Sequence, residues 1–245
     1  MMNYAISINH LTKTYNGKNA VDHISFSIKQ GELFGLLGVN GAGKTTLIKL
    51  LCGLLTPTSG HAAILGYDIK ENQKKVKEII AVSPQETAIA PNLTVRENLE
   101  LMAGIHGYSK TEVKEKTASM LAAFSLQPYE KQKSKTLSGG WQRRLSIALA
   151  LISEPQILFL DEPTLGLDIL GRRELWTLIE KLKEKTTIVL TTHYLEEAET
   201  LCDRICVMKD GQIKAIGTVE ELTNMTNTEN FEDAFVKLVA KEGIV

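Results

Sequence analysis

The chain has 245 residues, of which 43% are hydrophobic and 23% are charged, and its formal net charge is −1. This composition is typical of a globular protein with one large domain or two small ones, and the charge gives no electrostatic reason to expect a nucleic-acid partner. We expect neither a secretory leader nor a membrane span, and three cysteines do not suggest a disulfide framework, so the expected location is the cytosol.

The first part of the chain predicts strands of two kinds. Residues 4–8 and 21–28 alternate apolar and polar side chains, which is typical of half-exposed antiparallel strands. An apolar run over 33–37 predicts a buried strand, which leads through a glycine-rich turn into a helix ending near residue 55. The sequence then predicts a strand, a charged amphipathic helix and a short buried strand over residues 61–66, 69–78 and 79–82.

The pattern changes from about residue 86 to about 135, where no strand pattern occurs. Thr94 and Glu97 form a Thr-x-x-Glu capping box at the start of one predicted helix, and SKTEVKEKTASMLAAF predicts a second. We therefore expect an all-helical insert in this region.

Short buried strands return after the insert and alternate with helices. Such alternation predicts a parallel sheet with helices on both faces. The expected strands and helices, in chain order, span residues 157–160, 171–185, 187–192, 194–202 and 204–209.

The last elements are a strand at 212–216, a capping box from Thr218 to Glu221 and an amphipathic helix at 231–241. We interpret this last helix as a packing element, with a contact surface as the alternative. Cys202 and Cys206 are four residues apart, a spacing that could suit a metal, but buried thiols are the favoured interpretation.

The segment GVNGAGKT fits the phosphate-loop pattern G-x-x-x-x-G-K-S/T, and it lies between a predicted strand and a predicted helix. Its glycines let backbone N–H groups surround phosphate oxygens, Lys44 can reach the β- and γ-phosphates, and Thr45 offers a hydroxyl to Mg²⁺. The residues assigned to nucleotide binding here are Gly38, Asn40, Gly41, Ala42, Gly43, Lys44, Thr45 and Thr46.

The segment ILFLDE places two carboxylates at the end of a buried strand. Asp161 would lie at the carboxyl edge of the sheet beside the phosphate loop and complete the Mg²⁺ shell. Glu162 would point elsewhere, and it suits a second task, which is to orient and deprotonate the attacking water. Without the phosphate loop this pattern would indicate only the end of a strand.

A second glycine-rich turn, TLSGGWQRR, precedes the helical run LSIALALI. Ser138 can cap the helix, and Gly139 and Gly140 bare its first turn, which makes an anion site. Taken alone, the turn is a plain helix cap.

Together, Lys44, Asp161 and LSGGWQRR resemble the ATP-binding cassette (ABC) ATPases, the motor subunits of membrane transporters. The resemblance covers roughly residues 3–220. It implies an α/β fold with a P-loop (RecA-like) parallel-sheet core, an N-terminal antiparallel β subdomain and an α-helical insert. The expected division is an ATPase domain over 1–220, with its insert at about 86–152, and a short C-terminal helical tail over 221–245.

The resemblance also implies roles for residues outside the two phosphate motifs. Tyr15 matches the aromatic residue on which adenine stacks, Gln85 a glutamine of the Mg²⁺ shell, and His193 the histidine that contacts the γ-phosphate. Asp168 matches the aspartate of a loop that crosses between two copies. Ser138, Gly139 and Gly140 match a turn that closes over the ATP held by a second copy.

The sequence departs from the commonest family pattern at two positions. Trp141 stands where glutamine often follows the glycines, and it could pack on the insert or meet the partner subunit. Leu165 stands where a small residue is frequent. Arg143 and Arg144 could pair with acidic groups across the interface or hold their own helix.

The function implied by the resemblance is hydrolysis of ATP with Mg²⁺ by a dimer that encloses the nucleotide. The implied partners are a second copy or a homologous cassette and an integral membrane permease, with no nucleic acid. The subunit would lie in the cytoplasm on the inner face of the membrane, and compact single-cassette relatives favour export. The alternatives are a soluble ATP-driven clamp in DNA repair or translation, and a small-molecule kinase.

Overall fold

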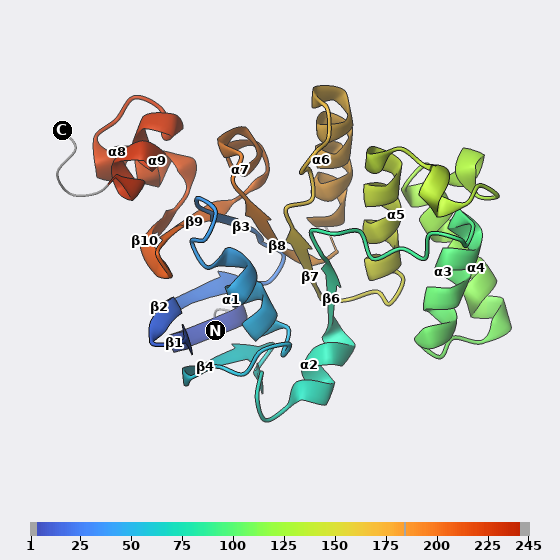
Figure 1. The fold of residues 1–245 in the computed structure, drawn as a ribbon, viewed down its shortest axis with the longest axis horizontal. Coiled ribbons are helices and arrows are strands. Elements are labelled where there is room, and N and C mark those ends of the chain that lie inside the picture. Colours follow the sequence, from blue (N-terminus) through green and yellow to red (C-terminus); the bar gives the residue numbers. More distant parts are fainter. Residues whose placement is uncertain (1–3, 184, 241–245) are drawn as a thin grey trace.

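The computed structural model describes residues 4–183 and 185–240, and this part of the chain forms two sheets (Figure 1). The larger sheet contains β3 (Leu33–Leu37), β6 (Ile80–Ser83), β7 (Ile157–Asp161), β8 (Thr187–Thr192), β9 (Arg204–Lys209) and β10 (Gln212–Gly217). Its strand order is β10-β9-β3-β8-β7-β6, and all neighbouring pairs are parallel except β10 with β9. The predicted parallel core is confirmed. Because β3, β7 and β8 are neighbours, their carboxyl ends meet at one edge.

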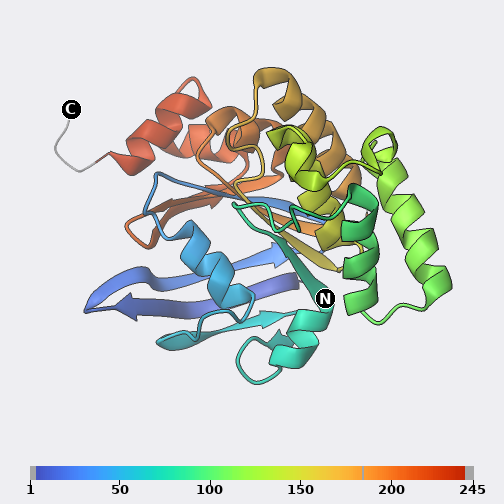
Figure 2. The ribbon, with the colours of Figure 1, turned by 45° about the vertical axis from the view of Figure 1, so that its right-hand side comes forward.

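Helices cover both faces of this sheet. Helix α1 (Lys44–Leu51) lies between the central sheet and the smaller antiparallel sheet, and its Leu47 and Ile48 belong to the core that joins the two (Figure 2). On the other face, α5 (Gly139–Leu151) and α6 (Ile169–Lys183) pack in a second core with strands β7 and β8. Helix α7 (Leu195–Leu201) follows β8.

The antiparallel sheet consists of β1 (Tyr4–Tyr15), β2 (Lys18–Lys29), β4 (Ser59–Ile64) and β5 (Tyr67–Asp68). Strands β1 and β2 are longer than predicted because they form one hairpin through Asn16 and Gly17, whose φ angles are +47° and +79°. Such a turn matches the twist of paired strands and extends their pairing to the tip.

Helix α2 (Gln73–Ile79) begins later than predicted. The Asp68 carboxylate accepts hydrogen bonds from the backbone N–H groups of Lys70 and Glu71 at 2.7 and 3.0 Å. These bonds fold the start of the predicted helix into a turn, a common alternative for aspartate near a helix start.

The expected helical insert contains α3 (Val95–Ile105) and α4 (Lys110–Ala123), followed by 3₁₀ turns at Gln127–Tyr129 and Ser134–Thr136. Figure 2 shows α3 and α4 beside the sheet-bearing part of the molecule. The capping box of Thr94 and Glu97 is confirmed, with Glu97 N donating to Thr94 Oγ1 at 3.1 Å and Thr94 N to Glu97 Oε2 at 2.8 Å. All residues from 84 to 156 are described, and none of them belongs to a strand.

The chain ends with α8 (Val219–Thr226) and α9 (Phe231–Val239). Phe231 and Ala234 of α9 are buried against β9 and α7, which confirms the packing interpretation of this helix. Residue 241, at the end of the predicted helix, lies outside the described residues. Within the described ranges, no helix combines the length and apolar character that crossing a bilayer requires.

Cys206 is a buried thiol, as favoured from the sequence, and Cys202 is partly buried. Burial raises the pKa of Cys202 and Cys206 well above the usual range. Among the described residues no group of histidine, cysteine, aspartate and glutamate side chains is arranged to hold a metal, so the alternative of a thiol metal site is not supported.

Candidate functional site

The phosphate loop folds as its sequence predicts, between β3 and α1. Gly43 precedes Lys44 with a φ of +104°, and a Cβ at this position would lie 2.3 Å from the carbonyl oxygen of Ala20. Only glycine tolerates both this φ angle and the lack of space for a Cβ. The tight turn that directs the N-terminus of α1 toward the cavity therefore depends on Gly43. The cavity beside the loop measures about 440 Å³, enough for a nucleotide's phosphates. Its lining residues are Ala20, Asn40, Gly41, Ala42, Gly43, Lys44, Thr45, Thr46, Gln85, Glu162, Leu165 and His193.

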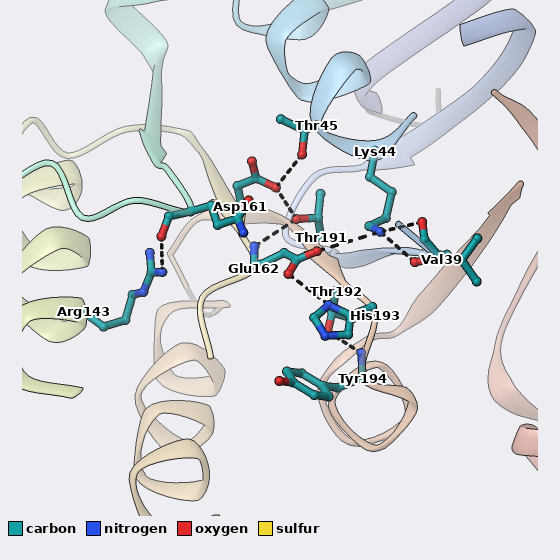
Figure 3. A network of polar contacts seen from close by, with 12 residues as sticks. Val39, Lys44, Thr45, Arg143, Asp161, Glu162, Thr191, Thr192, His193 and Tyr194 are labelled. Carbon is teal, nitrogen blue, oxygen red and sulfur yellow. Dashed lines mark hydrogen bonds and ion pairs between the residues drawn. The ribbon is translucent and has the colours of Figure 1, made fainter. Parts of the chain in front are cut away.

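Lys44 is 5% exposed and points into this phosphate-loop cavity from the first turn of α1. Its ammonium donates to the backbone carbonyls of Gly38 and Val39 at 2.7 and 3.3 Å, and it lies 3.9 Å from Glu162 Oε1 (Figure 3). Burial lowers the pKa of Lys44, and the nearby carboxylates oppose this shift. The Lys44 ammonium is thus held at the cavity wall by neutral backbone carbonyls, which are weaker acceptors than the charged phosphate oxygens that can replace them.

Thr45, which lines the cavity, brings its hydroxyl oxygen close to the carboxylate of Asp161. Thr45 Oγ1 donates to Asp161 Oδ1 at 3.3 Å, and the Thr191 hydroxyl donates to the same oxygen at 2.5 Å. Hydroxyl and carboxylate oxygens are ligands of the kind that Mg²⁺ prefers, and Mg²⁺ at phosphates commonly uses one or two protein groups. Thr45 and Asp161 therefore fit the predicted Mg²⁺ site.

Glu162 points away from Asp161, as expected, because its backbone adopts an unusual conformation. Its φ is +49°, a left-handed angle that is uncommon for residues other than glycine, and its N–H donates to Thr191 Oγ1 at 2.9 Å. The carboxylate is directed toward Lys44, and its Oε2 lies 2.9 Å from Nδ1 of His193, without the alignment of a hydrogen bond. Strained backbone of this kind clusters at functional sites, where surrounding contacts hold it in place.

Gln85 lies in the loop after β6 and lines the same cavity as Lys44 and Thr45. Its backbone carbonyl and that of Pro84 accept hydrogen bonds from the guanidinium of Arg143, at 2.5 and 2.6 Å. Arg143 therefore does more than hold its own helix, because it joins α5 to the loop after β6. Sequence reasoning missed this contact because it joins residues 58 positions apart. A pairing of Arg143 with acidic groups of a second subunit stays a prediction.

The Ser-Gly-Gly turn (Ser138, Gly139 and Gly140) lines a second cavity of about 350 Å³. Asp168, Gly166 and Leu170 also line it, and it shares no lining residue with the phosphate-loop cavity. Leu165 and Gly166, adjacent in sequence, line one cavity each. The structure thus brings Lys44, Thr45, Gln85, Glu162 and His193 together, but it leaves the Ser-Gly-Gly turn and Asp168 in a separate place.

The two glycines of this turn are not required by packing within the chain. A Cβ at Gly139 would meet nothing within 4 Å, and one at Gly140 would meet only Leu167 at 3.8 Å. Ser138 occupies the cap position of α5, but its side chain makes no capping hydrogen bond, so the prediction of a side-chain cap is wrong. The role of this turn toward a second subunit stays a prediction.

Trp141, whose contacts the sequence left open, packs on the insert. Its ring centroid lies 4.5 Å from that of Tyr129, and the guanidinium of Arg144 lies 4.5 Å from the Trp141 ring. Arg144 also forms an ion pair with Glu174 of α6. These contacts hold the wall of the Ser-Gly-Gly cavity in place.

Tyr15 and Asp168 have exposed positions. Tyr15, at the end of β1, is 44% exposed and lies outside the residues that line the phosphate-loop cavity; the Lys13 ammonium lies 5.1 Å from its ring centroid. Asp168 Oδ1 accepts a hydrogen bond from Gly171 N at 2.7 Å at the start of α6. Adenine stacking on Tyr15 and an intersubunit role for Asp168 remain predictions.

Residues 21–165, more than half of the chain, match the ABC transporter family. The chain belongs to this family. A solved ATP-binding subunit of an ABC transporter superposes with a TM-score of 0.86 at 29% identity, covering 96% of this chain and 100% of that one. Another, a dimeric ATP-binding cassette in a post-hydrolysis state bound to ADP and phosphate, has a TM-score of 0.79 at 29% identity, covering 87% of this chain and 98% of that one.

The ABC relatives include proteins named for drug resistance. DrrA of Streptomyces peucetius, a daunorubicin/doxorubicin resistance ATP-binding protein, is 41% identical over 89% of this chain and 66% of its own length. YbhF of Escherichia coli, named as a probable multidrug ABC transporter ATP-binding protein, is 42% identical over 240 residues, which are 96% of this chain. The matched region is 41% of YbhF, so the chain spans less than half of that relative.

Within this ABC fold, Thr191 is a site residue that the sequence analysis missed. It is fully buried, and its hydroxyl joins Asp161 to the backbone of Glu162. The parallel register of β7 and β8 places Thr191 opposite Asp161. A threonine in the run TIVLTT gives no signal of this role in the sequence, because the register is set by tertiary structure.

Proposed function

We propose that this chain binds and hydrolyses ATP as the motor subunit of a membrane exporter. The observation that carries the proposal is that Lys44, Thr45, Glu162 and His193 line one cavity. Asp161 lies beside this cavity and accepts a hydrogen bond from Thr45. In this arrangement the glycine-rich backbone and Lys44 bind the triphosphate, and Thr45, Gln85 and Asp161 hold Mg²⁺. When bound, Mg²⁺ neutralises charge on the phosphate oxygens.

Glu162 is assigned as the general base toward the attacking water. Its side chain is 12% exposed, with His193 Nδ1 2.9 Å from one carboxylate oxygen and the Lys44 ammonium 3.9 Å from the other. The proton of the water would pass to Glu162 while His193 and Lys44 contact the γ-phosphate.

The complete site would need two subunits. Ser138, Gly139 and Gly140 of one copy would close on the ATP in the phosphate-loop cavity of the other, with a second copy or a homologous cassette as partner. Support comes from the separation of the two cavities and from glycines that packing does not explain. The dimeric relative bound to ADP and phosphate agrees with this arrangement.

The membrane partner would dock at the groove between the insert and the sheet. A cavity of about 180 Å³ there is lined by residues of β6, α3 and α5, among them Met102, His106 and Leu149. Beside it, Leu101 and Ile105 of α3 are 50% and 68% exposed, as expected of apolar side chains that a partner covers. We place the subunit in the cytoplasm at the inner face of the membrane.

The names of the relatives support export over a role as a soluble clamp in DNA repair or translation. We infer a drug-like or lipophilic cargo class from those names.

The decisive experiment uses Glu162→Gln. We expect it to bind ATP, to lose about 10²–10⁴ in turnover and to accumulate as an ATP-dependent dimer in light scattering. Glu180→Gln, a change of the same kind at an exposed carboxylate of α6 that lines neither cavity, serves as a control for charge removal. Turnover of Glu162→Gln at the parent rate would refute the assignment of the base, and failure to dimerise with ATP would refute the shared site.

A further inference from the structure

Arg143 makes a buried connection between two parts of the molecule that are distant in sequence. It is 4% exposed, and its two terminal nitrogens donate to the carbonyls of Pro84 and Gln85 at 2.6 and 2.5 Å. Figure 3 shows its side chain reaching from α5 toward Asp161 and its neighbours. The planar guanidinium suits two adjacent carbonyls, whereas a lysine ammonium offers a single point of charge.

The two ends of this connection belong to different cavities. Gln85 lines the phosphate-loop cavity, and α5, which carries Arg143, starts at Gly139 in the Ser-Gly-Gly cavity. Arg143 lies about one helical turn behind that start. It therefore joins the wall of one cavity to the helix whose first turn forms the other.

The chemistry of this contact points to more than packing. A buried guanidinium carries a large desolvation cost, and here its bonded partners are two neutral carbonyls rather than a carboxylate. Arg144, the next residue, instead contacts Glu174 and Trp141. An apolar side chain could fill the Arg143 position, but it would leave the loop at Gln85 without a fixed orientation relative to α5.

We propose that Arg143 is a positioning residue that makes the loop at Gln85 and the Ser-Gly-Gly turn move as one unit. A nucleotide that draws in Gln85 then sets the orientation of the turn that is offered to the second subunit. This inference rests on the proposed function, in which that turn closes on the partner's nucleotide.

The test compares Arg143→Lys with its parent in the Glu162→Gln background. Two quantities are measured: the affinity of the monomer for ADP by calorimetry, and the ATP concentration that gives half-maximal dimer in light scattering. We expect unchanged ADP affinity and a roughly tenfold to hundredfold higher ATP requirement for dimerisation, from the loss of a charge-assisted hydrogen bond.

Arg204→Lys provides the matched control. Arg204 also donates to a backbone carbonyl, that of Ser27, and to Glu32, away from both cavities. We expect its substitution to lower the thermal unfolding temperature without changing the ATP requirement. Arg143→Lys with the parent's ATP requirement, or with ADP affinity and dimerisation weakened equally, would overturn the positioning role. If the Glu162→Gln parent itself fails to dimerise, the proposed function fails first, and this inference with it.

A second measurement does not depend on the folding of the variant. In the Glu162→Gln parent, kept dilute enough to remain monomeric, ATP should change amide exchange in residues 84–90 and 139–144 at the same ATP concentration. A change confined to the first segment would refute coupled movement.

Discussion

The hydroxyl of Thr191 offers a direct test of how the proposed Mg²⁺ site is built. It donates to Asp161 Oδ1 at 2.5 Å and accepts from Glu162 N at 2.9 Å, in a fully buried position. Thr191→Val keeps the shape of the side chain and removes both bonds. The hydrogen bond to the charged Asp161 contributes about 1.5–3 kcal/mol, and loss of a partner that holds a metal ligand costs about 10–100-fold in metal affinity.

We therefore expect the Mg²⁺ concentration for half-maximal ATP hydrolysis to rise about 10–100-fold in Thr191→Val. The assay is a Mg²⁺ titration of phosphate release at saturating ATP. Thr187→Val is the matched control, because Thr187 lies on the same strand and accepts a hydrogen bond from Gly31 N at 2.9 Å, at the other end of β8. An unchanged Mg²⁺ requirement in folded Thr191→Val would refute the role of Asp161 or its dependence on this hydroxyl.

Three further predictions concern other parts of the molecule. Gly43→Ala should abolish ADP binding, because its Cβ would lie 2.3 Å from Ala20 O at a φ of +104°; calorimetry showing the parent's affinity would contradict this. Burial raises the pKa of Glu197, so the folded carboxyl keeps a proton that the unfolded one loses, and stability falls as the pH rises above about 4.5. Glu197→Gln should therefore stabilise the fold more at pH 8 than at pH 5 in urea unfolding, and an equal effect at both pH values would contradict the shift. Thr94→Ala should lower stability by about 0.5–2 kcal/mol while ADP affinity stays constant, since it removes a capping box of the insert; a loss of ADP affinity would show that the insert shapes the phosphate loop.

The features predicted correctly from the sequence are those that a short continuous segment determines. The phosphate loop, the end of β7 at Asp161 and the capping box at Thr94 each lie in a short continuous segment of the sequence. Their backbone conformations follow from local chemistry, namely glycine torsions, apolar runs and cap hydrogen bonds.

Contacts between residues far apart in the chain could not be predicted from the sequence. The pairing of Asp161 with Thr191 follows from the register of β7 and β8, and the bonds of Arg143 follow from the way α5 packs beside β6. A single sequence holds no periodic signal for either. The late start of α2 had a local cause, the turn at Asp68, but it competed with an equally good helical pattern.

The left-handed backbone at Glu162 has a consequence for laboratory evolution. Glycine or asparagine adopts a φ of +49° at little cost, whereas a longer side chain there costs free energy that the fold must offset elsewhere. Libraries screened only for thermal stability should therefore enrich glycine or asparagine at this position and yield proteins that are more stable but inactive. Selection for ATP hydrolysis as well as thermal stability should retain Glu162, and the stabilising substitutions should then occur at other positions.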